Sequence, residues 1–164
     1  MILSHAEIKT VLPHRYPMLL VDAVRSIEPG QSIVAIKNVT GNEPCFAGLS
    51  EMAEPYGYAY PRSLIIESFG QAASIIYTLR RQEASDFGAV MLFGSARNCR
   101  FHGDVFPGDT MEHRARLERK LSDAAIFAGE VWVDDRRVVE VGQFIVAIRR
   151  PAAPSTNSAS LPAQ

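Results

Sequence analysis

The side chains that could move protons are few in this sequence, and one of them stands among apolar neighbours. Glu67 lies in the stretch SLIIESFGQAASIIYTLRRQ, residues Ser63 to Gln82. A carboxylate enclosed in this way can act as a general acid or base. Near a helix N-terminus, a carboxylate can instead be a solvated group that stabilises the helix by only about 0.3–1 kcal/mol. We favour the first interpretation, because the residues that flank Glu67 are apolar.

Four histidines could also carry protons. His5 lies in the terminal segment and has no further indication of a role. We expect His14 to be a hydrogen-bonded structural residue. His102 and His113 lie in or beside predicted strands near charged residues, so we expect both to be exposed to solvent.

Three tyrosines, Tyr56, Tyr58 and Tyr60, alternate just before the apolar stretch. With a pKa of about 10, a tyrosine is a poor base at neutral pH but a usable hydrogen-bond donor. Two interpretations remain open for these rings. We favour packing on the sheet or at a subunit interface, and hydrogen bonding within a site is the alternative.

Composition limits the classes of function. The chain has 164 residues, is 47% apolar, and carries a net charge of −1 from 17 basic and 18 acidic side chains. No cluster of basic residues indicates binding to nucleic acid or to an anionic membrane. The N-terminus lacks the apolar run of a signal peptide, so we expect a cytoplasmic protein. No residue spacing indicates a metal or cofactor site.

One folded domain is expected over residues 1–150. The remaining residues, 151–164, read PAAPSTNSASLPAQ, and they contain too little apolar surface to offset the entropy cost of ordering. We therefore predict a disordered C-terminal tail.

The hydrophobic pattern predicts one long helix and six strands. Apolar residues in the stretch 63–82 cover more than one helix face, so the helix should be enclosed by other elements. Ser63 could cap its first turn, Arg80 and Arg81 suit its end, and Gly70 could permit close packing. Strands are expected over residues 18–27, 32–40, 88–100, 110–121, 124–133 and 137–148, with a turn at 28–31. These elements predict an α+β fold in which an antiparallel sheet wraps round the helix.

Four segments together resemble one protein family. They are LPHRYPMLLVD at 12–22, IKNVTGNEPCFAG at 36–48, LIIESFGQAAS at 64–74 and ARNCRFHGDVFPGDT at 96–110. In type and order they are similar to the bacterial 3-hydroxyacyl-[acyl carrier protein] dehydratases. The resemblance implies a hot-dog fold, usually a dimer with sheets continuous across the interface. It also implies a site between subunits, where a histidine of one chain faces a helix carboxylate of the other beside an acyl tunnel.

The resemblance assigns roles to individual positions, and two positions depart from the family pattern. Glu67 matches the helix carboxylate. Leu49 stands where the family has its catalytic histidine, and Arg62 stands where a glycine normally follows the proline that Pro61 matches. The loop over residues 49–62 is longer than usual. Tyr58, Tyr60 and Gln71 complete the set of candidate substrate-binding or loop residues, together with Leu49 and Arg62.

The resemblance therefore leads to three hypotheses. In the first, the chain acts on 3-hydroxyacyl thioesters of acyl carrier protein in fatty-acid or polyketide biosynthesis, and gives Glu67 to a site completed by a histidine-containing partner subunit. As a homodimer it would then be inactive or very weak. In the second, the chain is a non-catalytic acyl-binding or scaffolding subunit. In the third and weakest, it is a thioesterase.

Overall fold

The apolar stretch forms the long helix α2 (Arg62–Leu79). The computed structural model of the protein describes residues 2–50, 52–79 and 89–149, so the expected helix end at Arg80–Gln82 lies outside the described residues. The helix begins one residue earlier than expected, directly after Pro61, whose carbonyl accepts hydrogen bonds from Leu64 N (2.9 Å) and Ile65 N (3.1 Å). Ser63 lies inside the first turn, so the prediction that it caps the helix is wrong.

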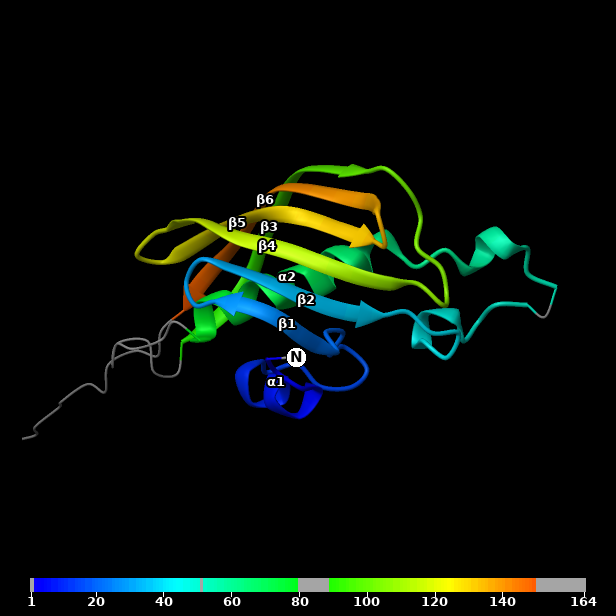
Figure 1. Cartoon of the computed structure of the whole chain (residues 1–164), viewed down its shortest axis with the longest axis horizontal. Coiled ribbons are helices and arrows are strands. Elements are labelled where there is room, and N and C mark those ends of the chain that lie inside the picture. Colours follow the sequence, from blue (N-terminus) through cyan, green and yellow to red (C-terminus); the bar gives the residue numbers. More distant parts are fainter. Residues whose placement is uncertain (1, 51, 80–88, 150–164) are drawn as a thin grey trace, which may run out of the picture.

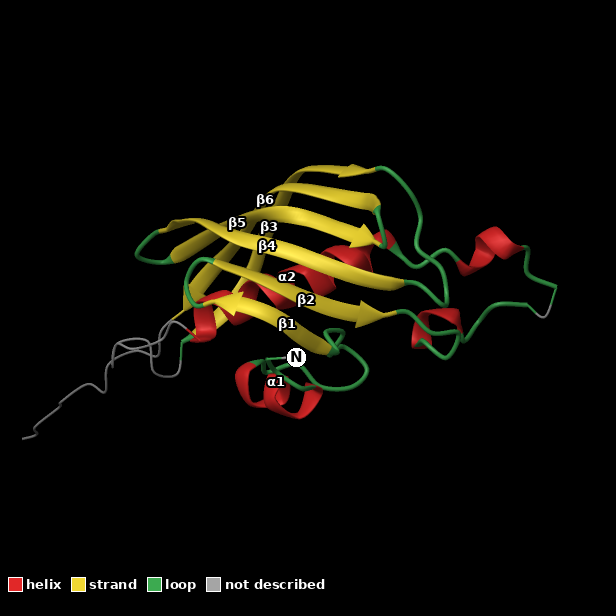
Figure 2. Ribbon diagram, in the orientation of Figure 1, coloured by secondary structure: helices red, strands yellow, loops and turns green. Residues whose placement is uncertain are grey.

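Six antiparallel strands form one curved sheet against α2 (Figures 1 and 2). They are β1 (Ala23–Glu28), β2 (Ser32–Asn38), β3 (Val90–Phe101), β4 (Thr110–Lys120), β5 (Ala124–Val133) and β6 (Arg136–Arg149). Their order across the sheet is β1-β2-β4-β5-β6-β3. The predicted α+β fold is thereby confirmed, as is the turn at 28–31, where Gln31 N donates to Glu28 O and Gly30 has a φ of 75°. The predicted tail, residues 151–164, lies outside the described residues.

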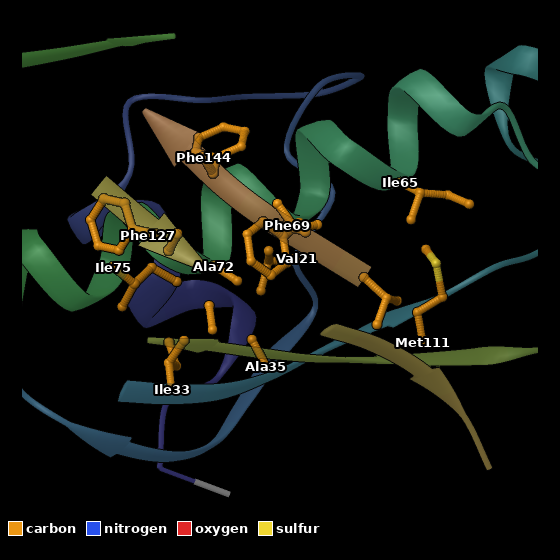
Figure 3. Packing of buried hydrophobic residues seen from close by; sticks show 14 of the residues in the cluster. Val21, Ile33, Ala35, Ile65, Phe69, Ala72, Ile75, Met111, Phe127 and Phe144 are labelled. Atoms are coloured by element: carbon orange, nitrogen blue, oxygen red, sulfur yellow. The ribbon is translucent and has the colours of Figure 1, made fainter. Parts of the chain in front are cut away.

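The core lies between α2 and the concave face of the sheet. Buried residues of the helix, among them Ile65, Phe69 and Ile75, pack against Met111 and Phe127 from the strands (Figure 3). Gly70 allows the closest approach, because a Cβ atom placed there would lie 2.3 Å from Cζ of Phe144. The predicted close packing at this glycine is confirmed.

Two expectations near the N-terminus need correction. Residues 18–22 do not belong to β1, because the backbone groups of Met18 and Leu20 bond to the Gln71 side chain and not to a neighbouring strand. The segment before them forms a short helix, α1 (His5–Val11), which the hydrophobic pattern did not reveal. Its start is a capping box in which Ser4 and Glu7 bond each other's backbone N–H.

The connection between β2 and α2 contains two short 3-10 helices, η1 (Pro44–Phe46) and η2 (Pro55–Tyr58). It extends away from the end of the sheet (Figure 1). Its first part is fixed by Lys37, a buried lysine whose ammonium group donates to Asn38 O (2.7 Å) and to the Glu43 carboxylate. A buried charge needs such a partner, so this pair holds η1 against the sheet.

The two margins of the sheet differ. Along β1, residues 2–3 add backbone bonds, from Ile2 N to Val24 O (2.8 Å) and from Val24 N to Leu3 O (2.9 Å). At the other margin, β3 pairs with β6 on one side, and none of the described strands pairs with its other side. This strand also exposes the apolar side chains of Val90, Leu92 and Phe93. Separately, none of the helices in the described ranges is long and apolar enough to cross a membrane.

Candidate active site

Glu67 lies in the second turn of α2, with its side chain 32% exposed. The residue is therefore at the edge of the enclosed helix surface, where a carboxylate remains reachable from outside the core. The neighbours on the buried side, Ile65 and Ser68, are almost completely covered. The helix thus presents a carboxylate at the boundary between the packed core and an open space.

Gln71, one helical turn later, fixes this carboxylate. Its side-chain amide Nε2 donates to Glu67 Oε1 (2.9 Å) and to Met18 O (2.6 Å), and its Oε1 accepts from Leu20 N (2.9 Å). Gln71 is only 1% exposed. Because the backbone of residues 18–20 holds both ends of the amide, the Gln71 side chain cannot rotate, and the position of Glu67 Oε1 is defined.

Two adjoining pockets share Glu67; the walls of the first are mainly apolar, and those of the second combine polar and apolar side chains. The helix-start pocket has a volume of about 370 Å³ and is lined by Arg62, Ser63, Ile66, Glu67, Phe93, Phe101 and Phe144. The smaller Glu67 pocket, of about 60 Å³, is lined by His14, Glu67, Gly70, Gln71, Ser74, Met91, Phe93, Phe144 and Val146. The site therefore combines one carboxylate with aromatic walls, which suits a ligand that has an apolar chain and a polar reacting end.

Arg62 is held at the wall of the helix-start pocket. Its guanidinium lies 4.9 Å from the centre of the Phe101 ring and 3.4 Å from Asp104 Oδ1. The other oxygen of Asp104 accepts a hydrogen bond from the Tyr56 hydroxyl (2.9 Å), and this bond raises the pKa of Tyr56. Asp104 thus ties the end of the long loop to the start of α2 and places a cation beside the pocket.

Leu49, Tyr58 and Tyr60 are not among the described residues that line these pockets. Leu49 packs against the core, and the Tyr58 ring lies 5.8 Å from the ring of Phe46. Tyr60 is 2% exposed, its hydroxyl has no partner among the described residues, and burial raises its pKa. Tyr58 and Tyr60 therefore pack against other residues, whereas Tyr56 is exposed and its hydroxyl binds Asp104.

The histidines are arranged differently from our expectation. His14 lies beside Glu67, with Nε2 3.5 Å from Oε1. His113 was expected to be exposed, but it is completely buried on β4, and its Nε2 lies 2.8 Å from Ser68 Oγ. The side chain of β4 at this position faces the helix, and burial lowers the pKa of His113 to about 3. His102 is 38% exposed beside Glu140, as expected.

Sequence reasoning missed the proximity of His14 to Glu67. The capping box at Ser4 and Glu7 could have revealed the short helix before this segment, but no local pattern indicates that the residues after it pass beside α2. Within the described part of the chain, no three His, Cys, Asp or Glu side chains are grouped closely enough to hold a metal ion.

Comparison with known proteins agrees with the fold. Residues 12–142 match the model of the FabA-like domain. The chain therefore belongs to the FabA-like family, and its sheet wrapped round α2 is the hot-dog fold of dehydratase-like proteins.

Among its relatives are the 3-hydroxyacyl-[acyl-carrier-protein] dehydratases FabZ of Colwellia psychrerythraea and Dechloromonas aromatica. The first is 40% identical over 146 residues, which cover 88% of this chain and 92% of the relative. The second is 41% identical over 128 residues, which cover 78% and 86%. The resemblance inferred from the four sequence segments is thereby confirmed.

Solved structures with the same fold are more distant in sequence. A chain of the dehydratase heterocomplex ApeI:P from Xenorhabdus doucetiae superposes with a TM-score of 0.67 at 18% identity, covering 88% of this chain and 91% of that one. A hypothetical thioesterase of Streptococcus pneumoniae, solved with coenzyme A, gives 0.58 at 8% identity, with coverage of 80% and 88%. At such identities the likeness describes the fold alone.

Proposed function

We propose that this chain is a dehydratase-like subunit that acts on 3-hydroxyacyl thioesters of acyl carrier protein in fatty-acid or polyketide biosynthesis, and that it contributes Glu67 to a composite site. The observation that carries the proposal is the position of Glu67, which is fixed by Gln71 at the junction of two pockets, the larger of which has mainly apolar walls. The FabZ relatives support the substrate class, because their names specify it.

The chemistry needs two proton-carrying groups. A base removes a proton from the carbon next to the thioester carbonyl, and an acid protonates the departing hydroxyl, so that a double bond and a water molecule form. Glu67 is suited to the second role, because it lies at the end of a cavity whose other walls are Phe93, Phe101 and Phe144. The acyl chain would lie along these rings.

The base would come from a partner subunit. In this chain Leu49 stands where the family has its histidine, and a leucine side chain cannot accept a proton. Leu49 is partly covered by the core, which gives it a packing role in place of a chemical one. The relative ApeI:P is itself a dehydratase heterocomplex, which supports an arrangement of two unlike chains. The partner in this arrangement is a histidine-containing homologue. We place both chains in the cytoplasm.

The helix start offers fewer donors to the thioester oxygen than a free helix end would. The N–H groups of Leu64 and Ile65 already donate to Pro61 O. The Arg62 guanidinium, held over Phe101, supplies a positive charge at the same end of the pocket. We therefore assign Arg62 to the recognition of the polar end of the substrate.

The test is Glu67→Gln in the complex of this chain with a histidine-containing partner, with dehydration of a 3-hydroxyacyl carrier-protein substrate as the assay. Turnover should fall about 10²- to 10⁴-fold, because the amide cannot give up a proton under these conditions. The chain alone should show negligible turnover. Glu140→Gln, on the outer part of β6, is the matched control and should leave the rate unchanged.

A dehydration rate in the Glu67→Gln complex equal to that of the unmodified complex would contradict the proposal. Robust turnover by the chain alone would contradict the need for a partner's histidine.

A non-catalytic acyl-binding subunit is the second candidate, and the aromatic walls of the helix-start pocket favour it. Native mass spectrometry distinguishes the two. Retention of an acyl carrier protein without conversion of its substrate, in every pairing, would support binding alone.

A further inference from the structure

We propose that Asp104 is a positioning residue that holds Arg62 at the helix-start pocket and makes this end of the site select a thioester over a free carboxylic acid. The inference rests on the proposed function, because it concerns how the polar end of the acyl substrate is recognised. Arg62 lines the pocket, whereas Asp104 is not among the lining residues and acts through the arginine.

The Arg62 guanidinium is held on two sides. Its face lies 4.9 Å from the centre of the Phe101 ring, and its Nη2 lies 3.4 Å from Asp104 Oδ1. A guanidinium carries five N–H groups in a planar fork, so donors remain for a substrate oxygen after these contacts are made. The side chain is 57% exposed, and without the two contacts it would be free to rotate.

Asp104 is in turn fixed by other residues. Its Oδ2 accepts a hydrogen bond from the Tyr56 hydroxyl (2.9 Å), and its backbone carbonyl accepts one from Arg136 Nη1 (3.0 Å). The Tyr56 ring packs edge-on against Phe106, with 6.4 Å between the ring centroids. The Asp104 carboxylate is therefore oriented before a substrate arrives, and it sets the position of Arg62.

The charges at this end of the pocket do not favour an anion. Arg62 and Glu67 are the charged residues among those that line the pocket, and Asp104 compensates the charge of Arg62. Arg136 lies 3.8 Å from Asp109, which forms a second compensated pair. A free carboxylic acid is ionised at neutral pH and would meet two carboxylates and no uncompensated cation. A thioester carbonyl is neutral and needs only N–H donors, so it is accepted.

A purely structural role for Asp104 is the alternative, because its contacts also close the long loop against the start of α2. An exposed ion pair contributes little to stability, so this role does not account for the pairing with Arg62. Both the arginine and the longer loop depart from the family pattern, and both bind Asp104. The two roles give different results in competition with a free acid.

The experiment uses Asp104→Asn in the assembly that shows turnover, because asparagine keeps the shape of the side chain and removes its charge. The KM of the 3-hydroxyacyl thioester should rise roughly two- to fivefold, and the inhibition constant of the free 3-hydroxy acid with the same acyl chain should fall by a similar factor. The kcat should stay within about twofold of the unmodified value, since Gln71 and not Asp104 holds Glu67.

Arg62→Gln provides the opposite arm. Its KM should also rise, but inhibition by the free acid should weaken, because the cation is gone. A general loosening of the fold would not give opposite signs in the two variants. Glu118→Gln is the matched control, since it removes the charge from an exposed arginine–carboxylate pair on β4 (2.5 Å from Arg116 Nε), and it should leave KM, kcat and the inhibition constant unchanged.

Thermal unfolding of each variant checks that the fold is retained. If Asp104→Asn does not fold, Tyr56→Phe carries the test. This variant leaves the charge of Asp104 in place and frees one of its oxygens, so the KM should still rise while the inhibition constant of the free acid stays unchanged.

Two results would overturn the inference and leave the proposed function intact. The first is an unchanged KM and inhibition constant in Asp104→Asn while Glu67→Gln abolishes turnover. The second is weaker inhibition by the free acid in Asp104→Asn, which would show that this carboxylate does not oppose anions. Absence of turnover in every assembly of the unmodified chain would overturn the inference and the proposed function together.

Discussion

At the scale of single residues, the site depends on how polar side chains are held within an apolar structure. Glu67 owes its position to Gln71, whose amide is bonded at both ends by the backbone of residues 18–20. His113, on β4, is equally buried, but its only hydrogen-bond partner among the described residues is Ser68. The first arrangement leaves a carboxylate reachable from a pocket, and the second removes an imidazole from solvent.

The buried His113 should make the protein less stable in acid. The pKa of His113 is about 3 in the folded protein, against an ordinary value of 6.5 in the unfolded chain. As the pH falls, the unfolded chain therefore takes up a proton first. This stability is complete above pH 6.5 and is lost progressively toward pH 3. Between pH 7 and pH 5 the loss is about 2 kcal/mol of unfolding free energy. Urea unfolding at both pH values measures it.

His113→Gln should lose less stability over the same pH interval, because an amide does not titrate. His102→Gln, at an exposed position, should keep the parental dependence. An equal loss of unfolding free energy in the parental chain and in His113→Gln would show that His113 is not the cause of the acid sensitivity.

At the scale of elements, the site is formed where α2 and β6 come closest. Phe144 lies on β6 opposite Gly70, and its ring contacts Phe69 (5.9 Å between centroids) and Phe93 (5.3 Å). The absence of a side chain at residue 70 is what admits this ring. The wall of both pockets therefore depends on one glycine of the helix.

Gly70→Ala should destabilise the protein by about 1–3 kcal/mol, because the new methyl group would overlap the Phe144 ring. A ring displaced toward the exposed Phe93 would also narrow the pockets, so affinity for an acyl substrate should fall. Chemical denaturation and binding measurements test the two effects. Gly41→Ala, where no atom lies within 4 Å of the added Cβ, should change stability by less than about 0.5 kcal/mol. Equal stabilities of the two variants would contradict the close packing at Gly70.

The sequence revealed the strongly periodic elements and missed those fixed by side chains. Helix α2 and the strands from β2 onward follow from runs of apolar residues, so their prediction needed only periodicity. Residues 18–22 also read as a strand, but Gln71, about fifty residues later, takes the backbone hydrogen bonds of Met18 O and Leu20 N. Glu67 was identified by its apolar surroundings. His14 was not placed beside it, because that contact depends on a loop path that no local pattern encodes.

At the scale of the whole molecule, β3 is the strand through which this chain would meet another. Its outer side pairs with none of the described strands, and Val90, Leu92 and Phe93 are exposed beside it. Exposed apolar side chains along an unpaired strand favour pairing with a second chain. The Glu67 pocket opens against this strand, through Met91 and Phe93, so a partner bound there would lie next to the site.

Leu92→Glu should weaken this association, because it places a charge where an apolar contact is expected. The expected result is a shift from dimer to monomer of the chain alone, measured by light scattering across a range of concentrations. Leu121→Glu, at a similarly exposed leucine directly after β4, should leave the mass unchanged. Dimers of Leu92→Glu that are as stable as those of the parent would exclude β3 as the interface.

The backbone that residues 2–3 lay along β1 limits how far such assembly can proceed. A sheet whose two outer strands are both unpaired could add strands at each, as fibrils do, whereas the bridge from Leu3 to Val24 covers the beginning of β1. If two chains join through β3, further growth would have to occur along β1, where residues 2–3 stand in the way at Val24. A truncation that removed these first residues should therefore increase aggregation.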